Sequence, residues 1–177
     1  PVWQAKIIAR AREIIEMGAD GFFLDTLDTV DVRTSSRYPI GEQTIGGMVS
    51  LIKLLKETFP QAKIVANRGF TILQYIAPYI DGLMFESFNT TYNFNTQKAD
   101  ELSESAKKYN LYIANFINTI RQQYYFPVFA LDYINDFEIS YMAQEYYNNS
   151  WTYDFIPYLQ ADILLSTVTK INVRPMK

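Results

Sequence analysis

Continuous apolar runs that end in a polar residue recur along this chain, and helix-like stretches separate them. Two runs share one pattern, Asp-Gly followed by three apolar residues, an acid and a hydroxyl residue, at residues 20–26 (DGFFLDT) and 81–87 (DGLMFES). Parallel strands buried on both faces read as continuous apolar runs, and their connections need crossovers, usually helices. The pattern therefore predicts βα units, with the Asp-Gly turn at the amino end of each strand and the acid at its carboxyl end.

The same reasoning extends along the whole chain and predicts an α/β fold of the (β/α)-barrel type. We expect a single domain over residues 1–177. The expected strands are residues 21–25, 63–66, 82–86, 128–133 and 153–159. The expected helices are residues 5–17, 44–59, 70–79, 97–124 with a possible break at Asn110, and 137–147. We expect residues 26–41 to form a polar loop, and loops of that length are often functional.

Composition limits the chemistry. The 177 residues include no cysteine and no histidine. This excludes disulfides, thiolate and histidine metal sites, cysteine nucleophiles and the serine–histidine–acid triad, so acid–base chemistry falls mainly to Asp, Glu, Tyr or Lys. A net charge of −3 without a Lys/Arg cluster argues against nucleic acid, and no apolar run is long enough to span a membrane. The 14 Tyr, 12 Phe and 2 Trp fit core packing or carbohydrate stacking.

The residues that close the strand-like runs are polar: Asp25, Asn67, Glu86 and Asp132. In a (β/α) barrel the carboxyl ends of the strands carry the active site. Two carboxylates facing one cleft, without histidine or cysteine, indicate glycoside hydrolysis. Alternatives remain open for each acid: Asp25 caps the next turn, Glu86 pairs with Arg68, or several acids bind Mg²⁺ or Ca²⁺. No phosphate loop or calcium-loop spacing accompanies the acids.

The segments DGFFLDTLD, ANRGF, DGLMFES, FALDY and FIPYL, within residues 1–160, resemble the endo-α-1,4-polygalactosaminidases and related bacterial glycoside hydrolases. The resemblance implies a (β/α)₈ barrel of the TIM type, a galactosamine-containing polysaccharide as substrate, and Asp25 and Glu86 as the catalytic pair. The chain offers five strand-like runs, which match strands four to eight of that barrel. We therefore expect it to be the later, C-terminal portion of a longer (β/α) barrel.

The sequence leaves open which of the two acids donates the proton. Glu86 comes after Leu83, Met84 and Phe85, and desolvation there would keep it protonated as the general acid. Asp25 has polar neighbours, Thr26 and Asp28, which suit an ionised carboxylate, although repulsion from Asp28 would instead favour its protonated form. The expected substrate-binding residues are Asp28, Tyr38, Asn67, Arg68, Asp132, Tyr133 and Tyr158.

We expect neither a cofactor nor a metal, and an extracellular or cell-envelope location. The sequence leaves the oligomeric state open. Two other hypotheses stay open: a carbohydrate-binding barrel without turnover, and an acid-rich metal-dependent enzyme on the same fold.

Overall fold

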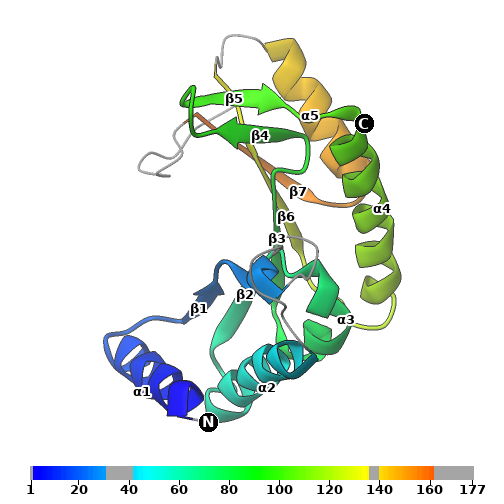
Figure 1. The fold of residues 1–177 in the computed structure, drawn as a ribbon. Helices are drawn as coiled ribbons and strands as arrows, with labels where there is room; N and C mark the ends of the chain where they lie inside the picture. Colours follow the sequence, from blue (N-terminus) through cyan, green and yellow to red (C-terminus); the bar gives the residue numbers. More distant parts are fainter. Residues whose placement is uncertain (1, 31–41, 136–139, 162–177) are drawn as a thin grey trace. The chain divides into compact units, whose positions relative to one another are not determined.

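A computed structural model of the chain describes residues 2–30, 42–135 and 140–161. Five strands form one sheet in the order β1-β2-β3-β6-β7 (Figure 1). These strands are β1 (Gly21–Leu24), β2 (Lys63–Asn67), β3 (Gly82–Glu86), β6 (Val128–Tyr133) and β7 (Ile156–Gln160). Each of them overlaps one of the five expected runs, which confirms the α/β fold class. Within the described residues, no helix is both long and apolar enough to cross a membrane.

The chain divides into two compact units. The first unit comprises residues 1–83 and 124–126, and the second comprises residues 84–123 and 127–177. The first unit contains the helices α1 (Val2–Glu16) and α2 (Glu42–Thr58) and the short helical turns η1 (Leu27–Val30), η2 (Phe70–Ile72), α3 (Leu73–Ile76) and η3 (Ala77–Tyr79).

In the first unit, β1 and β2 are parallel and in register, with Phe22 opposite Ile64 and Leu24 opposite Ala66. Ile64 and Ala66 are fully buried, and the Phe22 ring packs edge-on against Phe59, with centroids 5.6 Å apart. This face is the core of the unit. Because side chains alternate along a strand, Phe23, which is 52% exposed, points to the other face.

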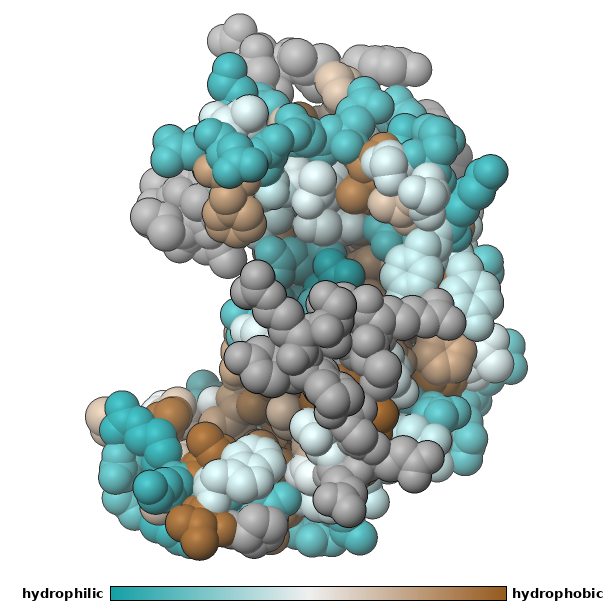
Figure 2. Space-filling view, in the orientation of Figure 1, coloured by the Kyte–Doolittle hydropathy of each residue, from teal (hydrophilic) through white to brown (hydrophobic). Residues whose placement is uncertain are grey.

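Aromatic residues occupy both the core and the surface. Phe85, Phe126 and Phe155 are fully buried. Trp3 and Phe23 are exposed, and Figure 2 shows hydrophobic residues at the surface of the unit that contains α1 and β1. Some of the aromatic residues thus form the core, and others are exposed at the surface, where another molecule can contact them.

The second unit contains α4 (Glu104–Arg121), α5 (Ser140–Thr152) and a two-stranded antiparallel hairpin of β4 (Thr90–Asn93) and β5 (Lys98–Glu101). Strands β6 and β7 are parallel, with Asp132 opposite Leu159 and Tyr133 opposite Gln160. Phe85, Phe88 and Phe155 form the aromatic core of this unit. The Phe88 centroid lies 5.0 Å from that of Phe85 and 5.3 Å from that of Phe155.

Three sequence expectations need correction. Residues 97–124 are not one helix, because β5 occupies Lys98–Glu101 and α4 begins only after the N-cap Ser103, whose Oγ accepts from Ala106 N at 3.2 Å. Helix α4 runs unbroken through Asn110, whose side chain bonds to carbonyls outside the helix. The last strand begins at Ile156, because the chain first turns through Asp154, which has a left-handed φ of 57°.

Candidate active site

Asp25 directly follows β1, and a neighbouring strand end orients its carboxylate. Oδ1 accepts hydrogen bonds from Thr26 N at 2.7 Å and from Asn67 Nδ2 at 2.9 Å. Asn67 is the last residue of β2 and is 5% exposed, whereas Asp25 is exposed. The bond to Thr26 is a local turn contact, and the bond to Asn67 links two strand ends. The result is an accessible carboxylate that a buried amide holds in place.

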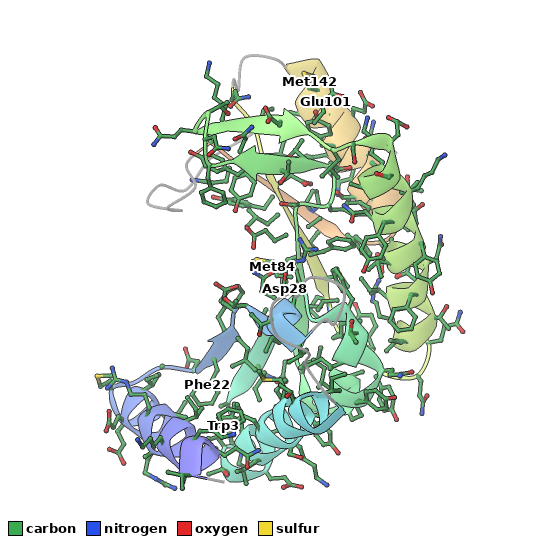
Figure 3. The ribbon with its side chains drawn as sticks, viewed as in Figure 1. Trp3, Phe22, Asp28, Met84, Glu101 and Met142 are labelled. Atoms are coloured by element: carbon green, nitrogen blue, oxygen red, sulfur yellow. The ribbon has the colours of Figure 1, made fainter. Side chains whose placement is uncertain are left out.

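Asp28 and Arg68 form an ion pair beside this carboxylate's turn. Asp28 lies on η1 (Figure 3), and its Oδ2 is 3.7 Å from Arg68 Nε. The Arg68 guanidinium also lies over the Phe70 ring, 5.7 Å from its centroid. Both residues were expected to bind substrate, and the structure joins them to each other within the first unit. The ion pair described for Arg68 is thus with Asp28, where the sequence had left pairing with Glu86 open.

Glu86 ends β3, and a tyrosine at the end of β6 holds it. Tyr133 Oη donates to Glu86 Oε1 at 2.6 Å, and the tyrosine itself is 3% exposed. In the β6–β7 register, Gln160 lies opposite Tyr133 and Tyr158 lies opposite Leu131. Paired residues of parallel strands share a face, so Tyr158 and Gln160 lie on the Tyr133 face, where Tyr158 Oη donates to Gln160 Oε1 at 3.0 Å. This face therefore carries two hydrogen-bonded pairs, the Glu86 carboxylate with the Tyr133 phenol and the Tyr158 phenol with the Gln160 amide.

Asp132 lies next to Tyr133 in sequence but on the opposite face of β6. Its carboxylate is 1% exposed and accepts from Asn89 N and Asn89 Nδ2, both at 2.6 Å, and from Thr90 N at 3.0 Å. Burial raises the pKa of Asp132 to about 6, against the hydrogen bonds from Thr90 and Asn89, which lower it. We therefore replace the expectation of direct substrate contact: Asp132 holds the turn that follows Glu86.

A left-handed backbone follows three of the strand-end residues. The positive φ angles are 61° at Thr26, 57° at Arg68 and 62° at Ser87. These residues come directly after Asp25, Asn67 and Glu86. A non-glycine residue in this region costs about 1–3 kcal/mol and persists where the surrounding structure imposes it, often at active sites. Each of the three polar residues is thus followed by a sharply turned, strained chain.

Sequence reasoning missed two asparagines near Glu86. Asn110 was noted only as a possible helix break, and Asn89 was not singled out. A polar side chain that competes with the backbone is an unusual choice for a helix interior, so Asn110 carried a usable signal. Tyr38, the remaining expected binding residue, lies outside the described residues. Among the described residues, no cluster of three or more acids is arranged to hold a metal ion.

The second unit also contains a cavity of about 510 Å³. Glu101 and Met142 both line it, and Figure 3 shows them close together. Its other polar lining residues are Asn89, Lys107, Glu145, Tyr146, Asn148, Asn149 and Thr152. Asn89 thus both lines this cavity and donates hydrogen bonds to the buried Asp132 carboxylate.

Comparison with known proteins supplies the family. Two similar solved structures are the glycoside hydrolase domain of PelA from Pseudomonas aeruginosa, at 22% identity and a TM-score of 0.77, and an alanine variant of that domain, at 21% and 0.76. Each match covers 96% of this chain and 64% of the PelA chain, and at this identity it shows the fold. No curated protein matches the sequence significantly. The family model described as glycoside-hydrolase family GH114 matches residues 1–172, and the chain therefore belongs to this family.

Proposed function

We propose that this chain carries the two catalytic carboxylates of a glycoside hydrolase, Asp25 and Glu86. The observation that carries the proposal is that both acids lie at carboxyl ends of parallel strands, and a polar side chain from the adjacent strand end holds each of them. Asn67 holds Asp25, and Tyr133 holds Glu86. A catalytic group must be oriented before the substrate arrives, and hydrogen bonds from buried residues provide that orientation.

The chemistry needs two carboxyl groups in complementary states. One protonates the glycosidic oxygen as the bond to the anomeric carbon breaks, and the other attacks that carbon or deprotonates the attacking water. A separation of about 5–5.5 Å between the carboxyl groups gives retention of configuration, and about 6.5–9.5 Å gives inversion. We propose that Asn67 and Tyr133 orient the pair, and that Asp28, Arg68 and Tyr158 contact the sugar.

The proposed substrate is a galactosamine-containing polysaccharide. Its support is the resemblance to the polygalactosaminidases and the acidic character of the chain, with a net charge of −3. A deacetylated amino-sugar polymer is cationic, so acidic residues attract it, and salt weakens this attraction. Because such a polymer is too large to cross a membrane unaided, we also propose an extracellular or cell-envelope location.

The experiment that tests the proposal replaces each acid by its amide. In the full-length enzyme, Asp25→Asn and Glu86→Gln should each lower turnover of an α-1,4-linked galactosamine polymer at least ~10²-fold, the low end for general acid–base catalysis. Asp20→Asn is a matched control, because Asp20 is exposed at the other end of β1. Glu104→Gln serves the same purpose for Glu86, since Glu104 is exposed on α4. If both amide variants fold and retain near-normal turnover, the pair is not catalytic.

A second candidate function is carbohydrate binding without turnover. The observation that favours it is the 510 Å³ cavity, which offers the carboxylates of Glu101 and Glu145, the amides of Asn148 and Asn149 and the phenol of Tyr146. Hydroxyl and ammonium groups of an amino sugar match such donors and acceptors. Polymer binding by the wild-type enzyme without any new reducing ends would favour this function over hydrolysis.

A further inference from the structure

We propose that Asn110 and Asp132 are positioning residues for Glu86, and that they act through the turn that follows it, residues 87–90. The inference rests on the proposed catalytic role of Glu86. Both fix the backbone that leaves β3 immediately after Glu86.

The turn begins in a strained conformation. Ser87 has a φ of 62°, and its N–H donates to Leu131 O at 2.8 Å. One backbone bond to β6 fixes a single point of the chain, whereas the left-handed residue needs its neighbours fixed as well. A strained φ persists only when the surrounding structure determines it. The side chains that fix the rest of the turn therefore also determine where Glu86 points.

Asn110 fixes the first half of the turn. Its Nδ2 donates to Ser87 O at 2.8 Å and to Phe88 O at 2.9 Å. The amide nitrogen carries two protons, and these two bonds use both. Asn110 lies buried in the interior of α4, where an asparagine is a poor helix former. The two hydrogen bonds to the turn explain why an asparagine occupies this helix position.

Asp132 fixes the second half. Its carboxylate accepts hydrogen bonds from the backbone N–H groups of the turn's last two residues, Asn89 and Thr90, and from the Asn89 side-chain amide. Thr90 Oγ1 exchanges two 2.8 Å bonds with the backbone N–H and carbonyl of Tyr133. The last two residues of β6 thus hold Glu86 in two ways: Tyr133 bonds its carboxylate from one face, and Asp132 bonds its turn from the other.

A role in stability alone explains Asp132 poorly. Burying a carboxylate costs desolvation energy, and replacing buried charged groups by apolar residues of similar volume is often neutral or stabilising. A buried acid is better explained by geometry, since one carboxylate accepts three directed hydrogen bonds and so sets the position of the turn.

The test compares two asparagines of α4 in the full-length enzyme. Asn110→Ala should lower kcat on the galactosamine polymer about tenfold or more while KM changes less than about threefold, because a displacement near 1 Å of a catalytic group lowers rate far more than binding. Asn118→Ala is the matched control. Asn118 donates Nδ2 to a backbone carbonyl too, that of Tyr153 at 3.1 Å, so its loss should lower stability and leave kcat unchanged. Urea unfolding of both variants shows that each is assayed as a folded protein.

Asp132→Asn is the second variant, and it keeps the test valid if Asn110→Ala does not fold. The amide oxygen can still accept from the turn's backbone, but the bond from Asn89 Nδ2 is lost, so a smaller fall in kcat is expected. Wild-type kcat in folded Asn110→Ala or Asp132→Asn, with Glu86→Gln inactive, would overturn this inference alone. Normal turnover in folded Glu86→Gln would overturn the proposed function and this inference with it. A fall in kcat in Asn118→Ala as large as that in Asn110→Ala would also overturn it.

Discussion

The buried carboxylate of Asp132 should make the stability of this protein depend on pH in a direction opposite to that of most acids. Burial raises its pKa from the ordinary 3.8 to about 6. Two units correspond to about 3 kcal/mol, at about 1.36 kcal/mol per unit. The folded state binds this proton more tightly than the unfolded state does. The stability that Asp132 gains from this tighter proton binding is therefore fully present below pH 3.8 and is lost as the pH rises through about 6.

The perturbation is a pH series from 4 to 7 on the wild-type protein and on Asp132→Asn. The free energy of unfolding is measured by urea denaturation, followed by tryptophan fluorescence and circular dichroism. The other titrating groups are the same in both proteins and largely cancel in the difference. Relative to Asp132→Asn, the wild type should therefore lose up to about 3 kcal/mol of stability across this range. A difference between the two proteins that is constant from pH 4 to 7 would refute the reasoning.

Two further predictions concern other polar contacts. Asp81→Asn should lower the free energy of unfolding by about 1–3 kcal/mol at pH 7, because Asp81 accepts from Lys56 Nζ at 2.7 Å and from Ile64 N at 3.0 Å. Burial opposes ionisation, but these bonds keep the pKa of Asp81 below 3.8. Urea unfolding should therefore show the stability difference between wild type and Asp81→Asn above that pH, and the difference should disappear as the pH falls below it. Tyr133→Phe removes the donor to Glu86 and should lower kcat about tenfold with small loss of stability; unchanged kcat at saturating substrate would count against the orienting role of the phenol.

The strands were predictable from the sequence, and the hairpin was not. Buried parallel strands leave continuous apolar runs, so β3 was predicted with both of its ends correct. The residues of β4 and β5, TTYN and KADE, are mostly polar and lack such a run. What closes the hairpin is turn chemistry: Asn93 Oδ1 accepts from Asn95 N and Thr96 N, and Gln97 adopts a φ of 56°. Neither feature shows in hydrophobic periodicity.

The strand ends were predictable too, but the direction of their side chains was not. Asp25, Glu86 and Asp132 were expected at carboxyl ends, where the structure has them. Residues one position apart point to opposite faces of a sheet, so only one of Asp132 and Tyr133 can share a face with the Glu86 carboxylate. A continuous apolar run shows no alternation of polar and apolar residues, so it does not indicate which residues point to which face of the sheet. The adjacent acid was therefore assigned to the substrate site, although the structure buries it on the other face.

The structure holds the segments that follow the two candidate acids by different physical means. In the first unit, the segment after Asp25 is held mainly by packing: Leu27 and Val30 of η1 are buried, and a Cβ added to Gly69 would lie 2.9 Å from the Leu27 Cβ. Gly69 has a φ of +65°, so both its conformation and the space beside Leu27 call for glycine. In the second unit, the turn after Glu86 is held by directed hydrogen bonds to a buried acid and a buried amide. Apolar packing does not titrate, whereas the Asp132 network does, so the effect of pH on geometry should concentrate at the Glu86 end of the proposed pair.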